Sequence, residues 1–197
     1  MEDKKQFDMR ARQFRAEGRF FDPAPVLLEM RRLQSEAVAN GPTEEDRNLG
    51  ARRIQEISEM RQGLLFCYAM SVRLERPVYF ARIEQADYDG IAYWPDGDCA
   101  RFSPIQLKEV PPQQLNPAAC LQDVLNGLEK YVDSADLVVA VHVNQVGTIT
   151  TGELVAPKTK LGGLWIFLAT NPDQTEWVLY GDLQDSAQSE TFFRYPE

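Results

Sequence analysis

The stretch VYFARIEQADYDGIAYWPDGDCARFSPIQLKEV, residues 78–110, decides the fold. It contains three runs rich in aromatic, β-branched and aliphatic residues, at Val78–Ile83, Tyr88–Trp94 and Arg101–Val110. Runs of this kind, when turn residues bound them, are typical of β-strands. The turn Pro95-Asp96-Gly97-Asp98 separates the second run from the third. We therefore predict a meander of three consecutive strands.

Two helices are predicted before the meander. The first covers Pro23–Ala39, with a proline near its start, where a missing N–H is harmless, and Asn40-Gly41-Pro42 at its end. Thr43 is expected to cap the second helix, and acidic residues that suit the helix dipole fill its first turn. Its apolar residues keep helical spacing to about Val72.

A helix and further strands are predicted after the meander. Asn116 is expected to cap a helix from Pro117 to about Val132. Leu137–Val143 is an almost continuous apolar run, typical of a strand buried on both faces. Because this strand returns through a crossover helix, it should pair in parallel with an earlier one. Leu164–Ala169 and Trp177–Tyr180 indicate a hairpin around Asn171-Pro172-Asp173.

These elements predict an α/β fold, a mixed central β-sheet flanked by helices, with extra C-terminal strands. We divide the chain into an N-terminal arm (1–22), a single α/β domain (23–183) and a polar, loosely attached C-terminal tail (184–197). The arm either packs or is solvated, or it contacts a phosphate or a protein partner. Its basic residues are Arg10, Arg12, Arg15 and Arg19.

The charge of the chain limits its partners. It has 21 basic and 30 acidic residues, a net charge of −9. Proteins that coat nucleic acid non-specifically need a broad basic field, so this class is disfavoured. A nuclease with a local basic cleft, or a module that binds a basic protein, remains compatible. The charged N-terminus and the short apolar runs predict a cytoplasmic protein with no membrane partner.

Cysteine and histidine usage restricts the metal chemistry. The three cysteines, Cys67, Cys99 and Cys120, form no CxxC pair, and we expect buried reduced thiols. His142 is the only histidine, which excludes a metal site built on two histidines of this chain. It lies in an apolar run, so a satisfied core histidine is favoured over a catalytic base.

One group of residues could carry chemistry. Side chains alternate along a strand, so Gln106 and Lys108 should share the face opposite Ile105 and Leu107. Asp89 precedes Gln106 by 17 positions, a spacing that a hairpin could close. Carboxylate and amide oxygens suit Mg²⁺, and a nearby lysine can orient or deprotonate a water molecule. The alternative is a solvated strand face with turn chemistry at Asp89.

At these residues the chain resembles the PD-(D/E)xK nuclease superfamily, also called the restriction-endonuclease-like fold. The matching pieces are Asp87-Tyr88-Asp89-Gly90-Ile91 and Pro104-Ile105-Gln106-Leu107-Lys108. The expected helix–three strands–helix–strand order over residues 43–143 also resembles its αβββαβ core. The resemblance implies Asp89 as a metal ligand, Gln106 in place of the usual Asp or Glu, and Lys108 as the motif lysine.

The resemblance also implies an acidic metal ligand from the preceding helix, with Glu56 the first candidate and Glu59 the second. The implied function is a hydrolase: an endonuclease that uses Mg²⁺ or Mn²⁺ to cleave DNA, in preference to RNA. Members of this fold often form homodimers. Gln106 is neutral where most members carry a carboxylate, so the alternative is a catalytically inactive member that acts as an acidic protein-interaction module.

Overall fold

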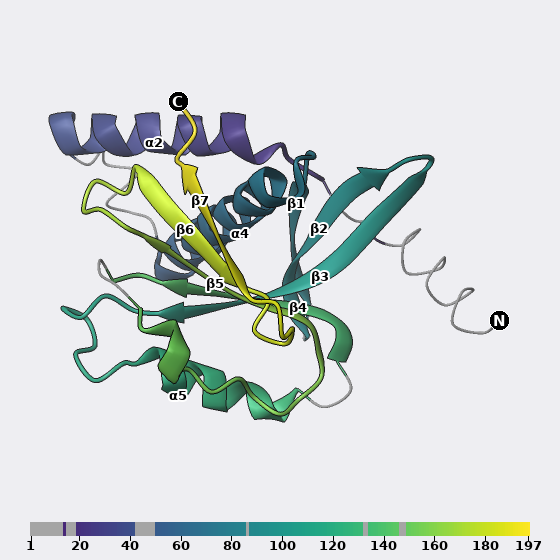
Figure 1. Cartoon of the computed structure of the whole chain (residues 1–197). Coiled ribbons are helices and arrows are strands. Elements are labelled where there is room, and N and C mark those ends of the chain that lie inside the picture. The colour runs from purple at the N-terminus through teal and green to yellow at the C-terminus, as the bar shows by residue number, and fades with distance from the viewer. Residues whose placement is uncertain (1–13, 15–18, 42–49, 86, 132–133, 146–148) are drawn as a thin grey trace.

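The protein is described by a computed structural model, which covers residues 14, 19–41, 50–85, 87–131, 134–145 and 149–197 (Figure 1). The two main helices are α2 (Pro23–Asn40) and α4 (Ala51–Leu74), and a short helix, α5 (Leu121–Asn126), continues into a 3₁₀ turn, η1 (Gly127–Lys130). The strands are β1 (Tyr79–Gln85), β2 (Tyr88–Asp96), β3 (Cys99–Val110), β4 (Ser134–Val143), β5 (Leu161–Ala169), β6 (Glu176–Gly181) and β7 (Ser189–Arg194). A second 3₁₀ turn, η2 (Thr151–Glu153), precedes β5.

All seven strands form one mixed sheet in the order β1-β2-β3-β4-β5-β6-β7. The pairs β3–β4 and β4–β5 are parallel, and the other four are antiparallel. The predicted meander, the parallel fourth strand and the hairpin of β5 and β6 are thus confirmed. The structure confirms a mixed α/β fold whose sheet is flanked by helices.

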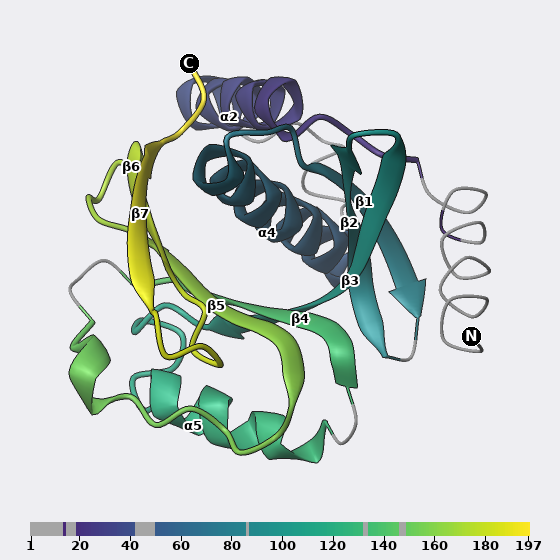
Figure 2. The same ribbon diagram turned by 45° about the vertical axis from the view of Figure 1, so that its right-hand side comes forward.

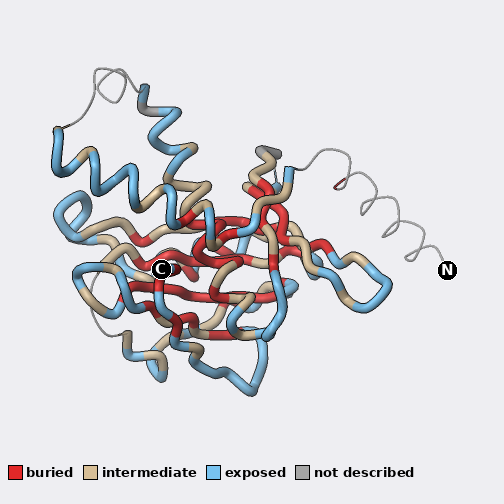
Figure 3. The backbone as a smooth tube through the Cα atoms, turned by 90° about the horizontal axis from the view of Figure 1, so that it is seen from above, coloured by how far each residue is buried: buried red, intermediate tan, exposed pale blue. Residues whose placement is uncertain are grey.

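Helices cover both faces of the sheet (Figures 1 and 2). Helices α2 and α4 lie on one side and α5 lies on the other. Strand β4 shows how the alternation of side chains serves both layers. Ala140 belongs to the core that includes residues of α4, whereas Val139 and Val141 belong to the core that includes residues of α5. Figure 3 shows that buried residues run along the central strands and that exposed residues concentrate on turns and outer helix surfaces.

The predicted helix over residues 117–132 is largely wrong. Only Leu121–Asn126 is α-helical, and η1 follows it. Asn116 does not cap a helix, because its Oδ1 accepts a hydrogen bond from the N–H of Ala118, 3.2 Å away, within a turn. Asparagine competes in this way with helix formation, since its side chain satisfies a nearby backbone donor outside a helix.

The prediction of a loosely attached C-terminal tail is also wrong. Residues 189–194 form β7, which pairs with β6 along its full length. Phe193 and Tyr195 are buried, and the Tyr195 hydroxyl donates a hydrogen bond of 2.9 Å to the Leu27 carbonyl of α2. Although residues 184–197 are mostly polar, they include the buried Phe193 and Tyr195. These two side chains hold the end of the chain against α2 and α4.

Part of the N-terminal arm packs against the sheet. Phe21 forms a bridge with Phe80 of β1. Phe14 and Phe20 contact the ring of Phe102, with centroid distances of 6.2 and 5.8 Å. Arg10, Arg12 and Arg15, together with the predicted Thr43 cap, lie outside the described residues. Helix α4 is described from Ala51, with Gly50 as its N-cap.

Two of the three cysteines differ from the expectation. Cys67 is buried in the core, as predicted, and burial raises the pKa of its thiol. Cys99 and Cys120 are exposed, so the prediction of buried thiols is wrong for these two. Within the described ranges, no helix has the length and apolar character that a membrane crossing requires.

Candidate active site

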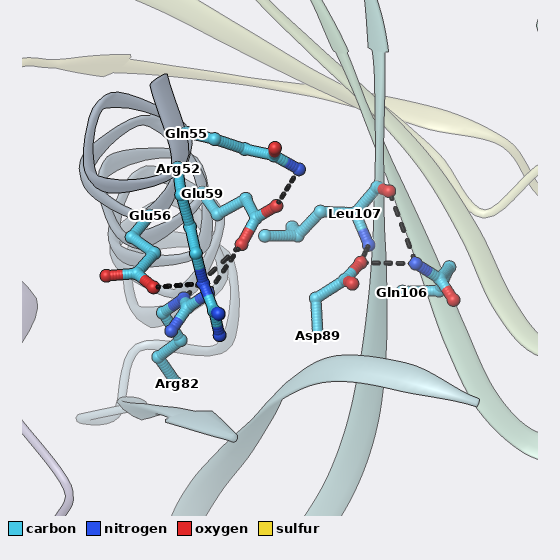
Figure 4. Close-up of polar contacts among 8 residues, drawn as sticks. All are labelled: Arg52, Gln55, Glu56, Glu59, Arg82, Asp89, Gln106 and Leu107. Atoms are coloured by element: carbon cyan, nitrogen blue, oxygen red, sulfur yellow. Dashed lines mark hydrogen bonds and ion pairs between the residues drawn. The ribbon is translucent and has the colours of Figure 1, made fainter. Parts of the chain in front are cut away.

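Asp89 and Gln106 meet where β2 and β3 cease to pair. The pairing ends at Gly90 and Ile105, so Asp89 and Gln106 occupy the next position on each strand. The Gln106 Nε2 donates a hydrogen bond to the Asp89 Oδ2. Figure 4 shows the Asp89 carboxylate directed at Gln106 and at the backbone of Leu107. The hairpin therefore closes the sequence separation of these two residues.

The Asp89 carboxylate also has a structural partner. Its Oδ2 accepts a hydrogen bond of 2.7 Å from the backbone N–H of Leu107, a residue that lies beyond the last β2–β3 pair. Burial raises the pKa of Asp89, and the charge of Glu59 adds to the rise. The Leu107 hydrogen bond, the Lys108 charge and the Gln106 hydrogen bond lower it in part. The site thus holds a half-buried carboxylate beside a cation.

Lys108 lies on the same face of β3 as Gln106, as the alternation of side chains predicts. It is half-buried, and its Nζ lies 5.9 Å from the centroid of the Tyr131 ring. Within the described part of the chain, Lys108 forms no ion pair with a carboxylate. Its charge still acts on Asp89, and it remains available for an anion.

Tyr131 belongs to this site, although the sequence did not single it out. It follows η1, and burial raises the pKa of its hydroxyl, with a further rise from the charges of Asp89 and Asp87 and an opposing effect of Lys130. No local pattern identifies this tyrosine, because the path of the chain from β3 through η1 to β4 brings it near Lys108.

The two glutamates of α4 are engaged elsewhere. Glu56 pairs with Arg52 at 3.3 Å, one turn earlier on the same helix. Glu59 pairs with Arg82 of β1 at 3.0 Å, and both side chains are about one quarter exposed (24% and 23%). Figure 4 shows both glutamates beside their arginines, with neither in contact with Asp89 or Gln106. Only Glu59 reaches Asp89 electrostatically.

Few of the described side chains near Asp89 could act as ligands of a metal ion. Among the described residues, no group of three or more His, Cys, Asp and Glu side chains could hold a metal ion. Asp89 supplies one carboxylate, and Gln106 turns its amide nitrogen toward that carboxylate, so Gln106 could add an oxygen donor only after its amide group rotates. Mg²⁺ often binds through one or two carboxylates while it keeps water and takes substrate phosphate oxygens. With the Gln106 amide rotated, the pair would suit a weakly held Mg²⁺ or Mn²⁺ rather than a closed cage of carboxylates.

His142 is buried, as expected for a core histidine, with 3% of its surface exposed. Its ring stacks on Phe167 at a centroid distance of 5.0 Å. Nδ1, however, has no hydrogen-bond partner among the described residues, and the Glu109 Oε1 lies 3.9 Å away. Burial lowers the pKa of His142 to about 3, and the charge of Arg61 adds to the shift. The ring is therefore neutral at physiological pH.

Comparison with protein-family models, with curated proteins and with solved structures gives no match for this chain. The functional assignment therefore depends on the geometry of the site.

Proposed function

We propose that this protein is a metal-dependent nuclease that hydrolyses phosphodiester bonds in DNA. The observation that carries the proposal is the contact between Asp89 and Gln106, with Lys108 on the same face and not ion-paired with any carboxylate that the structure describes. This places a carboxylate, a side-chain amide and a cation at one end of a hairpin. These groups suit a phosphodiester, because its hydrolysis requires charge neutralisation and an oriented water molecule.

The order of elements supports the same proposal. Helix α4, strands β1 to β3, helix α5 and strand β4 follow one another, and β4 is parallel to β3. This is the order that the resemblance to the PD-(D/E)xK superfamily implies. The acid lies on β2 and the Gln-x-Lys sequence lies on β3, the two strands that contain the matching sequence pieces.

Each residue would have a distinct role. Asp89 and Gln106 would hold Mg²⁺ or Mn²⁺, which supplies Lewis-acid polarisation of a phosphate oxygen and a more acidic water. The Leu107 N–H orients the Asp89 carboxylate. Gln106 would present its oxygen after its amide group rotates, since its nitrogen faces Asp89 in the structure. Lys108 would orient the water or offset charge on the phosphate.

A cleavage assay with plasmid and single-stranded DNA in Mg²⁺ or Mn²⁺ tests the proposal. Asp89→Asn keeps an oxygen acceptor for the Leu107 N–H but removes the charge, so we expect a folded protein without cleavage. Lys108→Ala should also abolish cleavage. Matched controls are Asp98→Asn, at an exposed turn residue, and Lys130→Ala, whose Nζ lies 5.3 Å from the centroid of the same Tyr131 ring. Both controls should keep wild-type activity.

The second candidate is an inactive member of the fold that acts as an acidic protein-interaction module. One observation favours it: the Asp89 carboxylate is already used by Leu107 and Gln106, and α4 adds no free glutamate. Absence of wild-type cleavage with every metal and substrate would favour this candidate. A pull-down should then recover a basic protein whose binding weakens as salt rises, because the chain carries a charge of −9.

A further inference from the structure

A pocket opens on the side of the molecule that α2 and α4 cover. Its volume is about 430 Å³, and it lies between α2, α4 and the turn that joins β5 to β6. Ligand pockets commonly measure roughly 300–1,000 Å³. The polar residues of its lining are Arg31, Gln34 and Ser35 of α2, Arg61 of α4, and Asp173, Gln174 and Tyr195.

Arg61 places a half-buried guanidinium in this pocket. Its Nη2 donates a hydrogen bond of 2.7 Å to the Gln174 Oε1, and its Cζ lies 5.7 Å from the centroid of the Trp177 ring. Burial lowers the pKa of Arg61, and the nearby charge of Arg31 lowers it further, while Tyr195 and Glu109 oppose the shift. The lowered pKa indicates a cation whose environment lacks full compensation.

Arg31 supplies a second guanidinium, and its position is well defined. Its Cζ lies 4.6 Å from the centroid of the Tyr195 ring, and its Nη2 donates a hydrogen bond of 2.6 Å to the Asp173 carbonyl. The hydroxyl of Tyr195 is itself held by the Leu27 carbonyl. The Arg31 guanidinium is thus fixed by a ring and a backbone oxygen, neither of which neutralises its charge.

Neither Arg31 nor Arg61 forms an ion pair within the described residues. This is unexpected in a chain with nine more acidic than basic residues. The next residue of α2 shows the usual arrangement: Arg32 is exposed and pairs with Glu29 at 2.7 Å and with Glu36. Two neighbouring guanidinium groups in a partly desolvated pocket repel each other, and an anion between them would relieve that repulsion.

We propose that this pocket binds a small organic oxyanion, either a phosphate monoester or a carboxylate. The planar guanidinium matches both groups, because its N–H donors can form paired hydrogen bonds with two oxygens. Gln34 and Ser35 supply further polar groups, and Val38 and Ala39 supply an apolar wall for the organic part. The site is separate from that of Asp89, since Gln106 and Lys108 lie on the opposite face of β3 from the residues that contact α4.

Isothermal titration calorimetry at low salt tests this site with three probes: inorganic phosphate, adenosine monophosphate and citrate. We expect saturable binding of at least one organic probe to the full chain. Adenosine monophosphate would identify a phosphate ester site, and citrate would identify a carboxylate site. Binding should weaken at least tenfold in Arg31→Met and in Arg61→Met, which keep most of the apolar stem but lose the charge. Arg32→Met is the matched control and should change binding less than twofold.

A second measurement covers the case in which a variant is unstable. In the absence of ligand, Arg61→Met should melt at or above the wild-type temperature, because it removes an uncompensated charge. The adenosine monophosphate or citrate that binds should raise the melting temperature of the wild type and of Arg32→Met but not that of Arg31→Met. Absence of saturable binding of all three probes, or equal affinity in wild type and Arg31→Met, would overturn the proposal. Binding of a 5′-phosphorylated oligonucleotide without binding of either organic probe would overturn the assignment to a small molecule.

Discussion

Asp89 has both a structural role and a role in the proposed chemistry. Its carboxylate satisfies the Leu107 N–H at the point where β2 leaves β3, and it also contacts Gln106. A substitution there changes both stability and activity unless the two roles are separated. Comparison of Asp89→Asn with Asp89→Ala separates the two roles, because asparagine keeps a hydrogen-bond acceptor and alanine does not.

Asp89→Ala should lower the free energy of unfolding by about 1–3 kcal/mol, because it leaves the Leu107 N–H without its acceptor. Asp89→Asn should cost less than about 1 kcal/mol, since its amide oxygen can still accept that hydrogen bond. Urea denaturation of both variants measures the difference. Equal destabilisation by the two substitutions would show that the charge, rather than the hydrogen bond, stabilises this end of the hairpin.

Gln106→Glu restores the carboxylate that the resemblance leads one to expect. Without metal it should lower stability by about 1–2 kcal/mol, the equivalent of roughly one pKa unit of repulsion from Asp89. Mg²⁺ or Mn²⁺ at millimolar concentration should recover the lost melting temperature, because the cation neutralises both carboxylates. Gln113→Glu, at an exposed position, is the control and should show no response to metal. A metal-independent melting temperature in Gln106→Glu would count against a cation site at Asp89.

At the scale of the element, β7 shows how a single buried face holds a strand in place. Phe192 and Phe193 are adjacent but point to opposite faces: Phe192 is 67% exposed and Phe193 is 6% exposed. Phe193 stacks against Trp177 at a centroid distance of 6.3 Å and packs against α4 through Tyr68. Within β7, Phe193 is therefore the aromatic side chain that faces the core, and the buried Tyr195 adds a second anchor just after the strand.

Phe193→Ala should lower the free energy of unfolding by about 3–5 kcal/mol, as expected for a buried phenylalanine that leaves a cavity. Phe192→Ala makes the same chemical change on the exposed face and should alter stability by less than about 0.5 kcal/mol. Thermal or urea denaturation compares the two. Similar effects at both positions would contradict the alternation of burial along β7.

At the scale of the whole molecule, the packed layers enclose one histidine, His142, whose protonation depends on pH. His142 lies under α4 between Phe167 and the carboxylate of Glu109, and Arg61 adds a positive charge nearby. Glu109 is itself held by Gln62 of α4, at 3.1 Å, and by Asn144 at 2.8 Å. Protonation of the histidine would therefore place a charge inside the packed layers.

The folded state should lose stability as the pH falls below about 6.5. The pKa of His142 is lowered from 6.5 to about 3, so between these values the unfolded chain binds a proton that the folded chain does not. This contributes a loss of up to about 1.4 kcal/mol per pH unit. His142→Leu should reduce the slope of stability against pH between 6.5 and 4.5. The ring signals of the only histidine can be followed by NMR, and titration near 6.5 in the folded protein would contradict this prediction.

Local patterns determined much of the fold and the meeting of the site residues. Alternation along residues 101–110 placed Gln106 and Lys108 on one face, and the hairpin turn brought Asp89 beside Gln106. The crossover predicted the parallel pairing of β3 and β4. The shared face and the hairpin contact depend on residues close in sequence, and the parallel pairing follows a general rule for crossover connections. These features can therefore be predicted from the spacing and order of the elements.

Other features were decided only by the tertiary structure. Two aromatic residues in a polar segment joined β7 to the sheet, and a turn at Asn116 shortened the following helix. Arg82 of β1 engaged Glu59 of α4, and segments more than 100 residues apart brought Gln174 to Arg61. The physical reason is the same in each case. Burial and charge pairing depend on which distant segments pack together. The spacing of residues within one segment does not identify the segment against which it packs.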